Sequence, residues 1–174
     1  MKKLLLIIVF LSIMSASAQH NVYDIQIQSI DNESIDLDSY RGKFILFVNV
    51  ASYCGYTGQY ADLQKLSEQY DNLEVIGLPC NQFLFQEPFS ASTIKKFCSS
   101  NYGVTFLMTE KISVKGKNQH NIYKWLTNKE LNKVKSSNVK WNFQKYLVSK
   151  EGKLIDFFPS KILPLSPEIT KHLD

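Results

Sequence analysis

Runs of apolar residues along the chain predict several strands. Residues 23–28 alternate between apolar and polar side chains, which predicts a short strand that turns at Asp31-Asn32 and returns over 34–37. The run from 44 to 51 is almost continuously apolar and rich in β-branched residues, as is typical of a central strand covered on both faces. Residues 73–78 predict a second buried strand of the same kind.

Helical periodicity follows these strands. Residues 57–70 carry apolar side chains at helical spacing, which predicts an amphipathic helix. Ser90 or Ser92 can cap a second helix, and Tyr102-Gly103 ends it. A third helix contains Trp125. These helices alternate with strands, which favours an α/β domain.

The C-terminal third predicts antiparallel strands and a last helix. Residues 145–149 and 154–158 flank Glu151-Gly152, which indicates a β-hairpin. Ser166-Pro167 begins a terminal helix with proline in its first turn. The order predicts a mixed central β-sheet flanked by helices, which is compatible with a thioredoxin-like fold, although periodicity alone does not select that fold.

The N-terminus has the pattern of a secretory signal peptide. Lys2 and Lys3 precede an apolar run over 4–14, and small residues follow at 15–18. The run is shorter than the roughly 20 residues that a membrane span requires. We expect cleavage after Ala18 and an exported protein, periplasmic or secreted, without stable membrane association. An uncleaved membrane anchor is the alternative.

Composition fits one globular domain over residues 19–174. The chain of 174 residues is 44% hydrophobic, and we find neither an internal repeat nor a Pro/Ser/Gly-rich linker. A net charge of +4 is too weak to indicate nucleic-acid binding. Arg41 is the only arginine, whereas bidentate binding of phosphates or carboxylates would favour more of them.

Three cysteines remain after residue 18: Cys54, Cys80 and Cys98. In an oxidising compartment an odd number cannot pair completely within one chain, and three are too few for a disulfide scaffold. Two interpretations stay open. The cysteines form one redox pair with a buried bystander, or one of them is a reactive thiol.

Cys54 is the first candidate for chemistry, because it follows the central strand and precedes a helix. Ligands of open α/β sheets bind beyond the carboxyl ends of strands, and a helix N-terminus favours a thiolate. Gly55 allows the backbone to approach closely. Thr57 stands where a thioredoxin C-x-x-C motif has its second cysteine. An inert, buried cysteine is the alternative interpretation.

The other candidates are weaker when each is taken alone. Cys98 lies on the apolar face of its helix and Cys80 ends a buried strand, so both fit core packing. Gln82 can cap a turn and Trp141 can be structural. The three histidines are far apart, and the chain has no glycine-rich phosphate loop, so we expect no metal and no cofactor.

Three motifs together resemble one family. Residues 49–57 (NVASYCGYT), 78–83 (LPCNQF) followed by 86–88 (QEP), and 141–148 (WNFQKYLV) are similar in order and spacing to the signatures of the glutathione peroxidases. The similarity runs from about residue 23 to the C-terminus. The cysteine in the first motif and a second cysteine downstream resemble the thioredoxin-dependent type.

The resemblance implies a thioredoxin-like fold and a thiol peroxidase with a tetrad of Cys54, Gln82, Trp141 and Asn142. The three partners supply neutral N–H donors for sulfur and peroxide oxygen. Reduction of hydrogen peroxide or of an organic or lipid hydroperoxide leaves a sulfenic acid on Cys54, as in a response to oxidative stress. By resemblance, Cys98 is the resolving cysteine of a Cys54–Cys98 disulfide. We expect a thioredoxin-like reductant rather than glutathione, and a monomer.

The chain departs from the family pattern at a few positions. Leu84 and Phe89 stand where the family usually has glycine, Gly58 where proline is common, and Leu107 where many members have proline. An exported thioredoxin-like disulfide oxidoreductase and a redox sensor remain alternative functions. The missing second cysteine of C-x-x-C argues against the former.

Overall fold

The computed structural model describes residues 21–173. The signal peptide predicted for residues 1–18 lies outside this range. Among the residues described, no helix combines the length and the apolar character that crossing a membrane requires.

A mixed five-stranded sheet forms the centre of the molecule, with the strand order β3-β2-β1-β4-β5. Its first three strands run parallel to one another, and the last two are antiparallel. The predicted mixed sheet is therefore confirmed. The strands are β1 (Phe44–Val50), β2 (Leu73–Pro79), β3 (Leu107–Met108), β4 (Lys145–Val148) and β5 (Leu154–Phe158).

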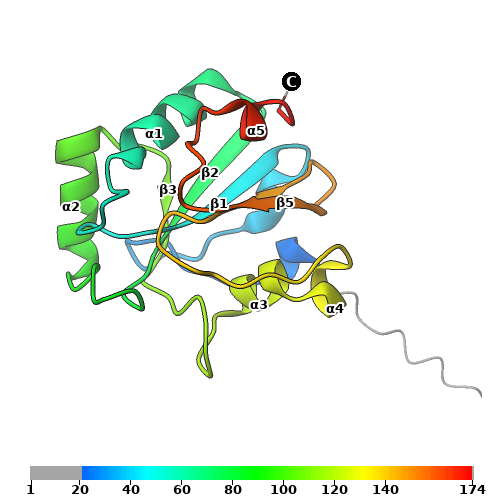
Figure 1. The fold of residues 1–174 in the computed structure, drawn as a ribbon, viewed down its shortest axis with the longest axis horizontal. Coiled ribbons are helices and arrows are strands. Elements are labelled where there is room, and N and C mark those ends of the chain that lie inside the picture. Colours follow the sequence, from blue (N-terminus) through cyan, green and yellow to red (C-terminus); the bar gives the residue numbers. More distant parts are fainter. Residues whose placement is uncertain (1–20, 174) are drawn as a thin grey trace, which may run out of the picture.

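Helices cover both faces of this sheet (Figure 1). One face is covered by α1 (Gln59–Gln69), α2 (Ala91–Tyr102) and α5 (Pro167–Thr170). The opposite face is covered by α3 (Asn121–Thr127) and α4 (Lys129–Asn132). The layers are those of an α/β domain, as the order of elements predicts.

The alternation of side chains along β1 divides the core into two clusters. Ile45 and Phe47 pack with α3, whereas Leu46 and Val48 pack with α1 and α2. Successive residues of a strand point to opposite faces, so a strand covered on both faces needs apolar residues at every position. This explains the almost unbroken apolar run of β1, all of whose residues after Phe44 are buried.

The predicted N-terminal hairpin is wrong in detail. Residues 22–24 form a 3₁₀ helix, η1 (Val22–Asp24), and a second one, η2 (Leu37–Tyr40), begins at the last residue of the expected return strand. Only an isolated bridge joins Gln28 to Ser34. The side chains of Tyr23 and Ile27 are buried against the core, although the backbone here is not part of a β-ladder. The alternation of apolar and polar residues therefore reflects packing against the core rather than strand pairing.

The ends of α2 follow the predicted signals. The Ser90 side chain accepts a hydrogen bond from the Thr93 N–H, which identifies Ser90 rather than Ser92 as the N-cap. Gly103 ends the helix with a φ of +64°, and its N–H donates to the carbonyls of Cys98 and Ser99. Cys98 thus lies in the last turns of a well-capped helix.

Candidate active site

Cys54 lies in the turn between β1 and α1, and the residue is 8% exposed. The helix begins only at Gln59, so the sequence expectation of a cysteine at the helix N-terminus is shifted by one turn of irregular chain. The backbone N–H of Tyr56 donates to Cys54 Sγ at 3.5 Å. This contact stabilises negative charge on the sulfur.

Thr57 fixes the turn that carries Cys54. Its Oγ1 accepts a hydrogen bond from the Cys54 N–H at 3.0 Å and lies 2.9 Å from the Ala51 carbonyl and 2.7 Å from the Cys54 carbonyl. One of these carbonyls accepts the hydroxyl proton. The position of the second cysteine in a C-x-x-C motif is therefore occupied by a hydroxyl that holds the backbone.

The loop after β2 is fastened to the Cys54 turn. The Tyr53 N–H donates to the Gln86 carbonyl at 3.0 Å. Ser52 Oγ lies 3.0 Å from both carboxylate oxygens of Glu87, which is fully buried. Burial raises the pKa of the Glu87 carboxyl. These contacts place the Gln86 backbone beside the residue that precedes Cys54.

Asn142 joins the same region from the segment before β4. Its Nδ2 donates to Gln86 Oε1 at 3.0 Å, while its buried Oδ1 has no protein partner among the residues described. Asn49 on β1 holds this segment from both sides, through Nδ2 to the Trp141 carbonyl (3.1 Å) and through its own carbonyl to the Phe143 N–H (2.6 Å).

Phe143 shows how firmly the segment is fixed. Its φ of +62° lies in the left-handed region, which residues other than glycine rarely adopt. The ring is fully buried and packs edge to face on Tyr60 of α1. Burial of the ring and the bond to Asn49 offset the backbone strain.

Trp141 borders the site with a half-buried indole. It packs against the apolar cluster that contains Cys54, and it lies 5.6 Å from the Phe83 ring on its other side. A pocket of about 480 Å³ opens between Trp141, Tyr56 and Lys161. The indole therefore lies between the cluster that contains Cys54 and a surface pocket, rather than in the core alone.

Gln82 lies elsewhere in this loop. Its Oε1 accepts hydrogen bonds from the Val114 and Lys115 N–H groups at 2.7 and 3.0 Å, and its Nε2 donates to the Lys115 carbonyl at 2.9 Å. The amide is thus committed to the chain after β3, and no contact of the described residues brings it to Cys54. The glutamine next to Asn142 is Gln86, which the sequence prediction did not assign although it stands in the quoted QEP motif.

The three cysteines are all free thiols and divide between the two faces of the sheet. Cys54 and Cys98 belong to the cluster covered by α1 and α2, and Cys80 belongs to the opposite one. Burial raises the pKa of Cys98 to about 11 and also raises that of Cys80. The Tyr60 hydroxyl is near enough to Cys98 to affect its pKa, although it has no hydrogen bond of normal geometry.

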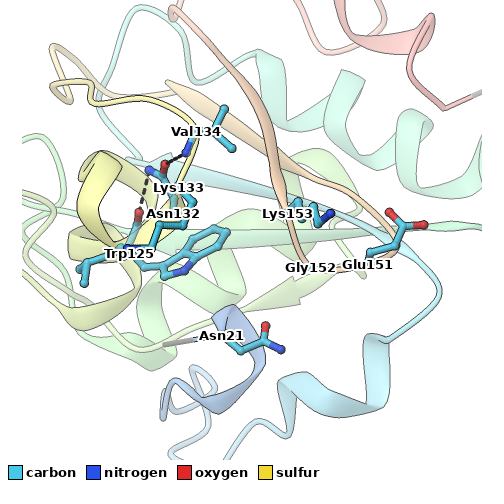
Figure 2. Close-up of a pocket in the computed structure, with 9 residues that line it drawn as sticks. Asn21, Trp125, Asn132, Lys133, Val134, Glu151, Gly152 and Lys153 are labelled. Carbon is cyan, nitrogen blue, oxygen red and sulfur yellow. Dashed lines mark hydrogen bonds between the residues drawn. The ribbon is translucent and has the colours of Figure 1, made fainter. Parts of the chain in front are cut away.

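Another cavity, of about 530 Å³, lies between α4 and the β4–β5 hairpin (Figure 2). The Asn132 amide borders it and donates to the Trp125 carbonyl at 3.0 Å. No cysteine lines this cavity, so it is separate from the thiol chemistry. Among residues 21–173, no three side chains of metal-ligating type come together.

Comparison with known proteins identifies the family of the chain. The family model for glutathione peroxidase matches residues 22–127. The chain is 41% identical over 157 residues to the glutathione peroxidase of Lactococcus lactis subsp. cremoris, covering 88% of this chain and 99% of the relative. It is 38% identical over 169 residues to the hydroperoxy fatty acid reductase gpx1 of Synechocystis, covering 92% of this chain and all of the relative.

A solved structure agrees as well. The crystal structure of Trgpx in apo form is similar with a TM-score of 0.67 and 31% identity, and the match covers 88% of this chain and 95% of that one. The thioredoxin-like fold and the family indicated by the three sequence motifs are thereby confirmed. The chain belongs to the glutathione peroxidase family.

Proposed function

We propose that the protein is a thiol peroxidase that reduces hydrogen peroxide and organic hydroperoxides through Cys54. The observation that carries this proposal is the convergence of a free, barely exposed thiol with the Gln86–Asn142 amide pair, on loops fastened to one another. The relatives named glutathione peroxidase and hydroperoxy fatty acid reductase support a peroxide substrate.

In the first step, the Cys54 thiolate attacks one oxygen of the peroxide. An S–O bond forms, the O–O bond breaks, and the departing oxygen leaves as water or an alcohol after protonation. The site must stabilise charge on that oxygen, and neutral N–H donors do so without burying an uncompensated charge. We assign this role to the amides of Gln86 and Asn142 and the indole of Trp141, with Gln86 in the place first predicted for Gln82.

In the second step, the Cys98 thiol condenses with the Cys54 sulfenic acid, and water leaves as the disulfide forms. Both residues belong to one apolar cluster, which favours Cys98 over Cys80 as the partner. Burial keeps Cys98 a thiol at neutral pH, with a pKa of about 11. We therefore expect the C-terminal turns of α2 to open before the disulfide forms.

A thioredoxin-like protein is the reductant that this arrangement favours. Sites that bind the two glutathione carboxylates tightly are expected to use arginine side chains. The single arginine, Arg41, is engaged with Asp38 at 2.5 Å and lies over the Tyr23 ring. An internal disulfide needs no bound glutathione.

Apolar hydroperoxides fit the surface beside the site. Tyr53, Leu84 and Phe85 are 62, 74 and 80% exposed, and all three flank the Cys54 turn or Gln86 along the chain. Leu84 and Phe85 have positive φ values of 51° and 53°, so this turn presents apolar side chains in a conformation that glycine would adopt more readily. We propose that they contact the apolar part of an organic hydroperoxide.

We further propose that the protein is exported after cleavage behind Ala18 and acts as a monomer. The N-terminal pattern supports the first point, and intact mass of exported material should show a chain that begins at Gln19. The short connection between Trp125 and Trp141 supports the second, and light scattering coupled to gel filtration tests it.

Steady-state kinetics test the proposed function directly. Hydrogen peroxide and a fatty-acid hydroperoxide are supplied in turn, with either thioredoxin or glutathione as reductant. We expect turnover of both peroxides with thioredoxin and little with glutathione. If neither thioredoxin nor glutathione supports consumption of either peroxide, the proposal is refuted.

A further inference from the structure

Lys145 is a fully buried lysine that has no acidic partner among residues 21–173. It begins β4 and belongs to the sheet face covered by α1, because Leu147, two residues on, packs in the cluster that contains Cys54. Its Nζ donates to Gln59 Oε1, to the Ile162 carbonyl at 2.6 Å and to the Ser160 carbonyl at 3.2 Å. Three N–H donors thus meet three oxygen acceptors.

The acceptors of Lys145 lead to both halves of the active site. Gln59 is the first residue of α1, directly after the Cys54 turn, and its Nε2 donates to the Ser160 carbonyl at 2.8 Å. Ser160 Oγ donates to the Asn142 carbonyl at 2.5 Å. One buried ammonium therefore connects the helix behind Cys54 with the segment that carries Asn142.

We propose that Lys145 is a positioning residue of the peroxidase. Its ammonium fixes the position of α1 relative to the Asn142 segment, so that Cys54 and Asn142 are correctly placed for attack on the peroxide. The inference rests on the proposed function. Lys145 touches neither Cys54 nor Asn142 side chains in any hydrogen bond described, so it acts through Gln59 and Ser160.

The protonation state decides whether the network is complete. An ammonium has three donors, whereas a neutral amine has two and a lone pair, so deprotonation removes one of the three hydrogen bonds that Nζ donates. Burial lowers the pKa of Lys145 to about 7. Positioning should therefore weaken as the pH rises through neutrality.

Within the part of the chain that the structure describes, no charged group packs against Lys145 Nζ. The neighbours of Lys145 in the sheet are Val48 on β1 and Phe158 on β5, and α1 presents the Gln59 amide. The segment after β5 presents two carbonyls, while Lys161 between them is exposed. Burial is the cause of the shift, without a contribution from a charged neighbour.

Single-turnover oxidation of Cys54 by hydrogen peroxide tests the proposal. The rate constants of wild type and Lys145→Met are compared from pH 5.5 to 8.5, with Lys153→Met as a matched control on the exposed β4–β5 hairpin. We expect wild type to react about tenfold faster than Lys145→Met at pH 6, since small displacements of reacting groups are costly. The ratio should fall as the pH rises to 8.5, where wild type has lost the ammonium and donates fewer hydrogen bonds, and it should stay near one throughout for the control.

A ratio near one at pH 6, or a ratio that does not change with pH, would overturn the proposal. If circular dichroism shows that Lys145→Met is unfolded, Ser160→Ala takes its place, because it cuts the link to Asn142 and leaves the Lys145 bonds intact. Ser160→Ala should then react several-fold more slowly, and an unchanged rate refutes the proposal. Failure of the proposed function itself is distinct: wild type would then react no faster than Cys54→Ser.

Discussion

The turn of Cys54 and the helix of Cys98 belong to one apolar cluster but provide opposite surroundings for a thiol. Cys54 lies at a strand end, receives a backbone N–H and adjoins loops that carry amide side chains. Cys98 is enclosed on a capped helix, where burial raises its pKa to about 11. This difference is the basis of the two proposed steps, in which Cys54 reacts in the folded state and Cys98 reacts after its helix opens.

The largest effect is expected for Cys54→Ser. This change removes the nucleophile and should lower peroxide turnover by more than about a thousandfold. The thiol is already packed as a small group, so the midpoint of thermal unfolding should change little. Peroxide consumption and circular dichroism check the two parts, and an active variant would overturn the assignment of Cys54.

Cys98→Ser should separate the two steps. We expect the first oxidation of Cys54 to keep its rate, because Cys98 does not take part in it. Turnover with thioredoxin should fall by more than about a hundredfold, because the internal thiol acts at high effective concentration. Stopped-flow oxidation and steady-state assays measure the two rates, and undiminished turnover would mean that Cys98 is a core residue only.

The two glutamines of the β2 loop provide a third comparison. Gln86→Ala should slow Cys54 oxidation by about a hundredfold, the typical effect of removing an oriented donor. Gln82→Ala is the matched control, because the described hydrogen bonds of its amide go to the chain at 114–115 and to Cys80 Sγ rather than to Cys54. It should leave the rate near that of wild type and reduce the free energy of unfolding by roughly 1 kcal/mol. If Gln82→Ala slows the oxidation of Cys54 and Gln86→Ala does not, Gln82 rather than Gln86 belongs to the tetrad.

The smallest effect concerns stability at alkaline pH. Burial raises the pKa of Cys98 to about 11, so between pH 9 and 11 the unfolded chain loses this proton while the folded protein keeps it. Stability from this group is therefore present below pH 9 and lost as the pH rises, by about 2 kcal/mol.

Denaturant unfolding of wild type and Cys98→Val at pH 8 and pH 11 isolates this contribution. Wild type should lose about 2 kcal/mol more than the variant, whose side chain cannot ionise. If wild type and variant lose the same free energy of unfolding, burial does not raise the pKa of Cys98 in the folded protein. The contrast between the surroundings of Cys98 and Cys54 would then be smaller than the structure indicates.

Much of the fold could be predicted because the signals were local and strong. The apolar run of β1, the caps of α2 and the Glu151-Gly152 hairpin all act through neighbouring residues. The N-terminal alternation failed because burial of Tyr23 and Ile27 gives the same pattern as strand pairing. β3 is only two residues long, too short to produce a pattern.

The motifs indicate the residue types of the proposed site, but they do not decide which of two glutamines belongs to it. Cys54, Trp141 and Asn142 follow from motifs, whereas two glutamines stand four residues apart in one loop. Choosing between them depends on turns of positive φ at Leu84 and Phe85, which the sequence does not reveal. Lys145 was likewise beyond prediction, because a lysine at the start of a strand is ordinarily exposed.

Disulfide mapping after one equivalent of hydrogen peroxide tests most directly whether Cys54 reacts with the peroxide and Cys98 then forms the disulfide. The reduced protein is oxidised, blocked with an alkylating reagent and digested, and its peptides are identified by mass spectrometry. The account predicts a Cys54–Cys98 disulfide with Cys80 alkylated as a free thiol. A Cys54–Cys80 disulfide, or a Cys54 sulfenic acid that persists beside an alkylated Cys98, would contradict it.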